Sequence, residues 1–268
     1  MVHGNELRLD DYLRRVGYDG PRTPTPAVLA ALHVAHVGRI PFENIDVQAG
    51  RPIRLDLASL QAKLVDGRRG GYCFEQNTLF AAVLRALGLS VTTLEARVRP
   101  PGASAILPRT HMVLAVEVAG ERYLADVGFG GDGLLAPIPF RAGVSHQDGR
   151  DLRLRREGRS HVLQARSDGA WSDLYAIAPG AVFPVDYEVA NHFTSTYATS
   201  PFRCTLTAQL SLPGERRILR NRTYLVRRGR VETTRELADE EIPALLRDAF
   251  GLPIPDGTVF PALADPPR

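Results

Sequence analysis

Apolar and polar residues alternate with one period in the first third of the chain and with another in its middle. Up to about residue 90, apolar residues recur every three or four positions, which is the spacing of amphipathic helices. Proline and capping residues help to define the ends of these segments. The pattern predicts helices over 6–16, 26–37 and 57–65, and another over the run that follows Cys73.

The period changes to two between about residues 91 and 178, where turn pairs such as Ala119-Gly120 separate the apolar runs. This alternation is typical of short antiparallel strands in a small barrel or twisted sheet. Further on, the pattern predicts a short helix near 187–193, then strands and a final helix, over 205–212, 223–228, 230–234 and 239–250.

The 268 residues therefore divide into three parts. We predict an α+β protein with an N-terminal helical bundle over residues 1–90, a central antiparallel β-barrel over 91–200 and a C-terminal α/β region over 201–268. The last part is expected to close over the other two as a lid.

Cys73 stands at the start of the last helix of the first part. Gly70 and Gly71 permit a tight turn into that helix, and the unpaired N–H groups of its first turn favour a negative charge such as a thiolate. Most buried cysteines are inert packing residues. Here, however, polar and charged residues crowd the cysteine, and suitable partners follow in the sequence, so Cys73 is a candidate nucleophile.

Those partners are His111 and Asp126. The predicted hairpin around Ala119-Gly120 places them near the same end of two paired strands, diagonally opposed and within side-chain reach. A carboxylate beside an imidazole fixes its tautomer and supports the imidazolium that forms when a thiol gives up its proton. The sequence thus supplies a nucleophile, a base and an orienting acid.

Several separate segments together resemble one known family, the arylamine N-acetyltransferases. They are residues 9–17, 40–46, 69–77, 110–112, 126–131, 191–193 and 200–202. The resemblance implies a triad of Cys73, His111 and Asp126 in an arrangement similar to that of cysteine proteases. It further implies that an acetyl group moves from acetyl-CoA, through an acetyl-cysteine, to an arylamine or arylhydrazine, as in xenobiotic metabolism, with no permanently bound cofactor.

The segment from Gly128 to Gly133 matches G-x-G-x-x-G, the pattern of dinucleotide-binding loops. Two prolines follow within 134–139, so no helix opens there, and no βαβ unit frames the motif. In the family this loop lies by the acetyl-CoA pocket. The implied cofactor contacts are Thr110, Phe129, Gly130, Gly131 and Phe202, and the aromatic residues predicted to line the acceptor site are Phe42, Tyr72, Phe129 and Phe193.

The formal net charge is only +3, and Lys63 is the sole lysine among 33 basic residues, which we interpret as a compositional bias. Like charges do not form blocks, which argues against a nucleic-acid partner. The N-terminus has no signal-peptide pattern and no apolar run reaches membrane-spanning length, so we expect a cytoplasmic protein without a membrane partner. Cys73 and Cys204 are expected to be reduced, with Cys204 packed in a strand-like run.

Metal binding and other activities are the alternatives. His33 and His36 lie three residues apart on a predicted helix, but no third ligand is near, so we predict ordinary helix-face histidines and no metal site. The triad also suits a thiol hydrolase, or an amide synthase that closes a macrolactam on an aryl amine with an acyl chain from an acyl carrier protein. A binding protein without activity is a further alternative. The physiological amine, the preferred acyl chain and assembly into a homo-oligomer stay open.

Overall fold

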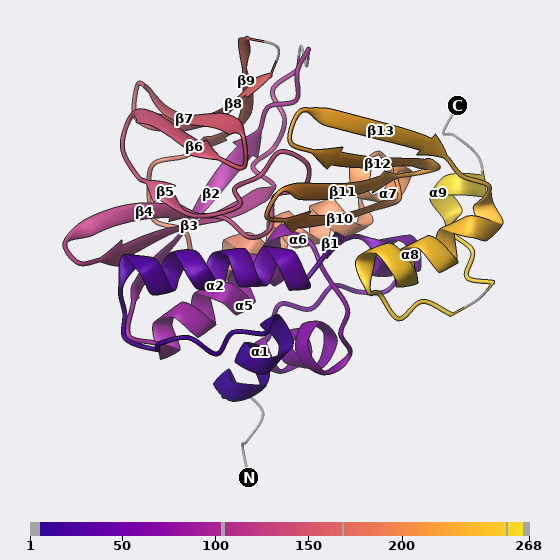
Figure 1. Ribbon diagram of the computed structural model, residues 1–268, viewed down its shortest axis with the longest axis horizontal. Helices are drawn as coiled ribbons and strands as arrows, with labels where there is room; N and C mark the ends of the chain where they lie inside the picture. Colours follow the sequence, from indigo (N-terminus) through magenta and orange to yellow (C-terminus); the bar gives the residue numbers. More distant parts are fainter. Residues whose placement is uncertain (1–5, 103–104, 168, 256, 265–268) are drawn as a thin grey trace.

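A computed structural model describes residues 6–102, 105–167, 169–255 and 257–264. The helices of the first third of the chain form the lower part of the molecule in Figure 1, and two antiparallel sheets lie above them. The helical elements of the first part are α1 (Leu9–Val16), α2 (Pro26–Arg39), α3 (Ile45–Gln48), α4 (Leu57–Leu60), the π-helix η1 (Gln61–Asp66) and α5 (Cys73–Ala86). The part of the chain described here includes no helix long and apolar enough to cross a bilayer.

Local sequence explains where α2 begins, and a local irregularity divides the helix predicted over 57–65. Thr25 caps α2 by accepting the N–H of Val28 at 3.2 Å, and Pro26 occupies a position where its missing N–H costs nothing. The predicted third helix is α-helical only at its start and continues as a π-helix. Its widened turn is visible where the N–H of Gly67 reaches back five residues to the carbonyl of Ala62, at 2.9 Å.

The larger sheet forms the predicted barrel-like part of the molecule. Its eight strands run in the order β5-β4-β3-β2-β9-β8-β7-β6, and a core that includes Leu94, Val113 and Leu163 fills it. The two end strands do not pair, but Gln147 of β6 accepts the backbone N–H groups of Leu135 and Ala136, just before β5, so that the barrel is nearly closed. The strands are β2 (Ser90–Val98), β3 (His111–Val118), β4 (Glu121–Ala125), β5 (Ile138–Pro139), β6 (Gly143–Gln147), β7 (Arg150–Glu157), β8 (Ser160–Ser167) and β9 (Ala170–Ile177).

The β3–β4 hairpin has the register that its two-residue turn predicts. Val116 pairs with Tyr123, and Leu114 pairs with Ala125. His111 is consequently the first residue of β3, and Asp126 follows directly after β4. The turn chemistry of Ala119-Gly120, both at positive φ, fixes this arrangement.

The second sheet combines strands from both ends of the chain, in the order β1-β10-β11-β12-β13. Its first strand, β1 (Phe42–Glu43), comes from the helical part and also bridges to Gly71, so the segment before Cys73 lies where the helices meet this sheet. The other elements of the C-terminal half are α6 (Pro184–Thr196), α7 (Pro201–Cys204), β10 (Thr207–Leu212), β11 (Glu215–Arg220), β12 (Thr223–Arg228), β13 (Val231–Glu236), the 3₁₀-helix η2 (Asp239–Glu241), α8 (Ile242–Phe250) and α9 (Pro261–Ala264).

This half differs from the prediction at β11 and α7, and the prediction also contained no helix at α9. Strand β11 was missed, because charged arginines interrupt its apolar alternation. The strand-like interpretation of the run around Cys204 is wrong, since this run is the short helix α7. Ser200 accepts the N–H of Phe202 at 3.3 Å and Pro201 starts the turn, which favours a helix over a strand.

Candidate active site

Cys73 is the first residue of α5 and is almost completely buried. Its thiol donates to the carbonyl of Thr110 at 3.6 Å, and both cysteines of the chain are free thiols. The loop after β4 lies directly on the first turn of α5. A Cβ atom on Gly128 would stand 2.6 Å from the Cα of Cys73, so only glycine allows this approach.

His111 and Asp126 form a buried pair beside Cys73. The Nε2 of His111 lies 2.7 Å from Oδ2 of Asp126. Burial lowers the pKa of His111, but the charge and hydrogen bond of Asp126, together with the neighbouring Cys73, raise it more, and the net pKa lies well above its ordinary value. The charge of Asp126 and the neighbouring Cys73 therefore favour the protonated form of the imidazole.

Besides His111, neutral groups hold the carboxylate of Asp126. Its Oδ1 accepts the side-chain amide of Asn77 and the N–H of Gly128, each at 3.0 Å, and its own N–H donates to Nε2 of His33 at 3.2 Å. Burial raises the pKa of Asp126, but His111 and these donors outweigh burial and lower it. We call His33, Asn77, His111, Asp126 and Gly128 the Asp126 network.

Sequence reasoning missed two members of this network. Asn77 lies four residues after Cys73 on the same face of α5, and this spacing was a usable signal. His33 gave no such signal, because its contact with Asp126 spans 93 residues. Instead of ordinary helix-face residues, His33 and His36 are core residues with hydrogen-bonded rings, and burial lowers the pKa of His33 to about 4 and that of His36 to about 3.

The predicted aromatic residues fall into separate groups. The centroid of the Phe129 ring lies 5.1 Å from that of the His111 ring. The centroid of the Phe202 ring lies 5.2 Å from that of Tyr72 and 6.0 Å from that of Phe42, so these three rings form a second group. Tyr72 is fully buried, and its hydroxyl donates to Asn191.

Phe193 stands apart from both groups. Its ring stacks on Tyr197 with 4.6 Å between the ring centroids. The structure thus brings Phe42, Tyr72 and Phe202 together, and places Phe193 with a different aromatic neighbour.

Side chains of the C-terminal sheet form hydrogen bonds to the glycine-rich loop over residues 128–133. Gln209 accepts the N–H of Gly131, and Arg216 donates to the carbonyls of Gly131 and Gly133 at 2.7 and 2.8 Å. A small cavity opens beside this loop, lined by Val37, Ile40, Phe42, Asp126, Val127, Phe129, Leu134, Gln209 and Ser211. Within the described ranges, no group of three His, Cys, Asp or Glu side chains is placed to hold a metal ion.

Comparison with known proteins gives a consistent result. The family described as N-acetyltransferase matches residues 25–259. The arylamine N-acetyltransferase of Mycolicibacterium smegmatis is 40% identical over 257 residues, which cover 93% of this chain and 94% of the relative.

Solved structures agree with this likeness. A structure of the M. smegmatis arylamine N-acetyltransferase superposes with a TM-score of 0.90 at 36% identity and covers 97% of both chains. The Mycobacterium marinum arylamine N-acetyltransferase in complex with CoA superposes with a TM-score of 0.87 at 38% identity, covering 91% of this chain and 92% of that one. With a matching family over most of its length and relatives well above 30% identity, the chain belongs to the arylamine N-acetyltransferase family.

Proposed function

We propose that this protein transfers an acetyl group from acetyl-CoA to an arylamine or arylhydrazine through an acetyl-Cys73 intermediate. The observation that carries the proposal is the buried His111–Asp126 pair beside a free thiol at a helix start. The M. marinum neighbour was solved with CoA, which supports a CoA thioester as the donor.

In the first half-reaction, the thiolate of Cys73 attacks the thioester carbonyl and a tetrahedral oxyanion forms. Backbone N–H groups at the first turn of α5 would stabilise that oxyanion. The carbon–sulfur bond to CoA breaks, His111 gives its proton to the departing thiolate, and the acetyl group stays on Cys73. One thioester replaces another, so no metal or redox group is needed.

In the second half-reaction, the amine attacks acetyl-Cys73 and His111 accepts the proton that the amine loses. The amide leaves, and the thiolate and imidazolium are restored. Asp126 keeps the imidazole oriented throughout. The C-terminal part, residues 201–268, would act as a lid that keeps water from the intermediate.

We assign donor contacts to Thr110, Phe129, Gly130, Gly131 and Phe202. For the acceptor we propose aromatic contacts with Phe42, Tyr72, Phe129 and Phe193. Phe129, beside His111, suits contact with an aromatic ring. We infer a cytoplasmic location. The names of the relatives favour acetyl transfer over macrolactam closure or hydrolysis.

The test uses Cys73→Ala with Cys204→Ala as its matched control. Cys73→Ala should abolish acetyl transfer from acetyl-CoA to an aromatic hydrazine while its thermal unfolding stays close to wild type, because only one sulfur atom is lost. Cys204→Ala should keep its activity. Incubation with acetyl-CoA alone should leave an acetyl group on the Cys73 peptide, detected by mass spectrometry. Normal turnover by Cys73→Ala would end the proposal.

A further inference from the structure

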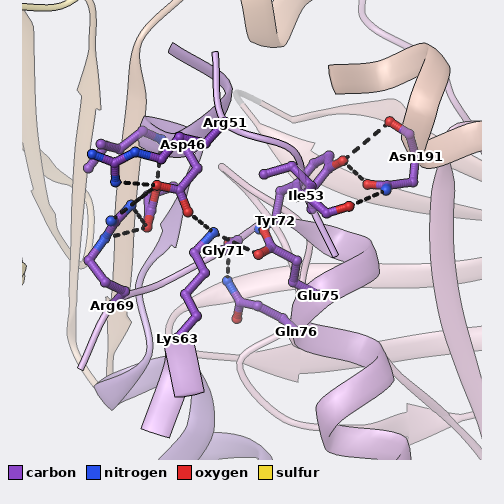
Figure 2. Close-up of polar contacts among 12 residues, drawn as sticks. Asp46, Arg51, Ile53, Lys63, Arg69, Gly71, Tyr72, Glu75, Gln76 and Asn191 are labelled. Carbon is purple, nitrogen blue, oxygen red and sulfur yellow. Dashed lines mark hydrogen bonds and ion pairs between the residues drawn. The ribbon is translucent and has the colours of Figure 1, made fainter. Parts of the chain in front are cut away.

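Five charged side chains are linked by ion pairs next to the start of α5. They are Glu43, Asp46, Lys63, Arg69 and Glu75, which we call the Lys63 network. Figure 2 shows Lys63 reaching between Asp46 and Glu75, with its Nζ 2.8 Å from Asp46 and 2.7 Å from Glu75. Arg69 completes the network through Glu43 at 2.8 Å and Asp46 at 3.2 Å. The three carboxylates share two partly buried cations, and the mostly exposed Arg51 also pairs with Asp46 at 3.3 Å.

Glu75 connects this network to the backbone next to the nucleophile. While one carboxylate oxygen binds Lys63, the other accepts the N–H of Tyr72 at 3.0 Å, and Tyr72 immediately precedes Cys73. A Cβ atom on Gly71 would stand 2.6 Å from that second oxygen, so the glycine makes room for the carboxylate. Glu75 therefore caps α5 from its third position and fixes where the helix begins.

Gln76 reinforces the same segment. Its amide donates to the carbonyls of Gly71 at 2.7 Å and Pro41 at 3.1 Å. Two consecutive side chains of α5 thus tie the residues before Cys73 to the helix that Cys73 starts.

The position of Lys63 depends on an unusual backbone. Lys63 belongs to the π-helix η1. The backbone carbonyl of Lys63 accepts the N–H of Arg69 at 3.1 Å. π-turns occur often at functional sites. Lys63 is also the single lysine of a chain with 33 basic residues. A compact ammonium with three donors fits between two carboxylates, where the planar fork of an arginine would need more space.

Charge explains why Glu75 needs this partner. Burial raises the pKa of Glu75 to about 7, although Lys63 opposes the shift. Without Lys63, the carboxylate would be stranded in the core and would take up a proton or move toward another donor. A protonated Glu75 could still accept the Tyr72 N–H, as a glutamine would, but a carboxylate that moves away would leave Tyr72 uncapped.

We propose that Glu75, held in place by Lys63, is a positioning residue that sets the backbone at Cys73 and so aims its thiol at His111. This inference rests on the proposed role of Cys73 as the nucleophile. Glu75 itself need not touch either substrate.

The experiment measures the second-order rate of Cys73 alkylation by iodoacetamide at pH 7, resolved by peptide mass spectrometry, alongside kcat and KM for acetyl-CoA. In Glu75→Ala the cap is lost, and we expect alkylation and kcat to fall about tenfold, the scale set by one capping hydrogen bond, with KM unchanged. Glu75→Gln keeps an oxygen that accepts the Tyr72 N–H, so it should remain within about threefold of wild type, whereas a loss caused by missing charge alone would appear in both variants.

Lys63 is tested through the same readouts. Lys63→Met should resemble Glu75→Ala, and the double variant Lys63→Met/Glu75→Gln should recover, because the glutamine leaves no charge stranded. Arg22→Met, which removes an exposed ion pair with Asp10, is the matched control for loss of a cation. Thermal unfolding confirms that each variant is folded at the assay temperature, and the two Glu75 variants decide the question if Lys63→Met does not fold.

Wild-type rates in Glu75→Ala, or a double variant no faster than Lys63→Met, would overturn the inference. Alkylation uses no acyl donor and is therefore independent of the acetyl-transfer assay. A wild-type protein that transfers no acetyl group would contradict the proposed function, while the alkylation rates would still report on the alignment of the thiol.

Discussion

The Asp126 network and the Lys63 network meet at the first two turns of α5 and are built in opposite ways. On one side, Asn77 and the backbone N–H of Gly128 hold a single carboxylate, and burial lowers the pKa of His33 so that its ring is neutral. On the other side, Glu75 is held by a fixed cation within a set of buried ion pairs. Helix α5 therefore contributes the neutral amide of Asn77 to one network and the carboxylate of Glu75 to the other.

The proposed chemistry gives a reason for this difference. His111 must gain and lose a proton, and a second fixed cation near Asp126 would compete with the imidazolium for the carboxylate. Neutral donors hold Asp126 without that competition. Around Glu75 no proton needs to move, so charged partners can fix the geometry, provided that each buried charge is matched.

The largest expected effect on kcat comes from a change at Asp126. Asp126→Asn keeps the shape but removes the charge and allows the wrong tautomer of His111, so kcat should fall by about 10³–10⁴-fold, as in triads generally. The same change of carboxylate to amide at Glu75 should cost only about threefold, since only an acceptor is needed there. Steady-state kinetics with an aromatic hydrazine measures both, with the exposed Asp10→Asn as control. Activity near wild type in Asp126→Asn would show that Asp126 supports the fold but is not needed for the reaction.

A second prediction tests whether His33, which lies beside Asp126, is neutral. The pKa of buried His33 is lowered from 6.5 to about 4, so between these pH values the unfolded chain binds a proton that the folded protein does not. The free energy of unfolding should therefore be unaffected by His33 above pH 6.5 and should fall by about 3 kcal/mol as the pH drops to 4.

Urea unfolding of wild type and His33→Gln between pH 4 and 7 tests this. The variant should lose that part of the pH dependence, while buried His36 continues to contribute its own. If the free energy of unfolding depends on pH in the same way in both proteins, His33 binds its proton as readily in the folded state as in the unfolded chain, and the prediction is wrong.

The smallest effect separates buried ion pairs from exposed ones. Arg22 and Asp10 form a 2.6 Å pair, but their side chains are 57% and 71% exposed. Arg22→Met should shift Tm by less than about 2 °C, because water screens such pairs. Differential scanning calorimetry would show it, and a shift as large as that of Lys63→Met would remove the distinction between the two kinds of pair.

Much of the fold followed from local patterns. The hairpin register depends on the two turn residues between β3 and β4, and the start of α2 depends on Thr25 and Pro26. The prediction failed where local signals conflicted, as in arginine-rich β11 and in the α7 run around Cys204. The division of the 57–65 helix into α4 and a π-helix also had no signal in the hydrophobic pattern.

The sequence by itself determined that a cysteine starts a helix after two glycines, and that a hairpin brings His111 to Asp126, because helix starts and tight turns are set by neighbouring residues. Only the tertiary structure decided what surrounds them. His33 reaches Asp126 across 93 residues, Arg216 grips Gly131 across 85, and the single lysine turns inward to meet Glu75. Such contacts arise when distant segments pack and buried polar groups find partners, and no periodicity along the chain encodes that choice.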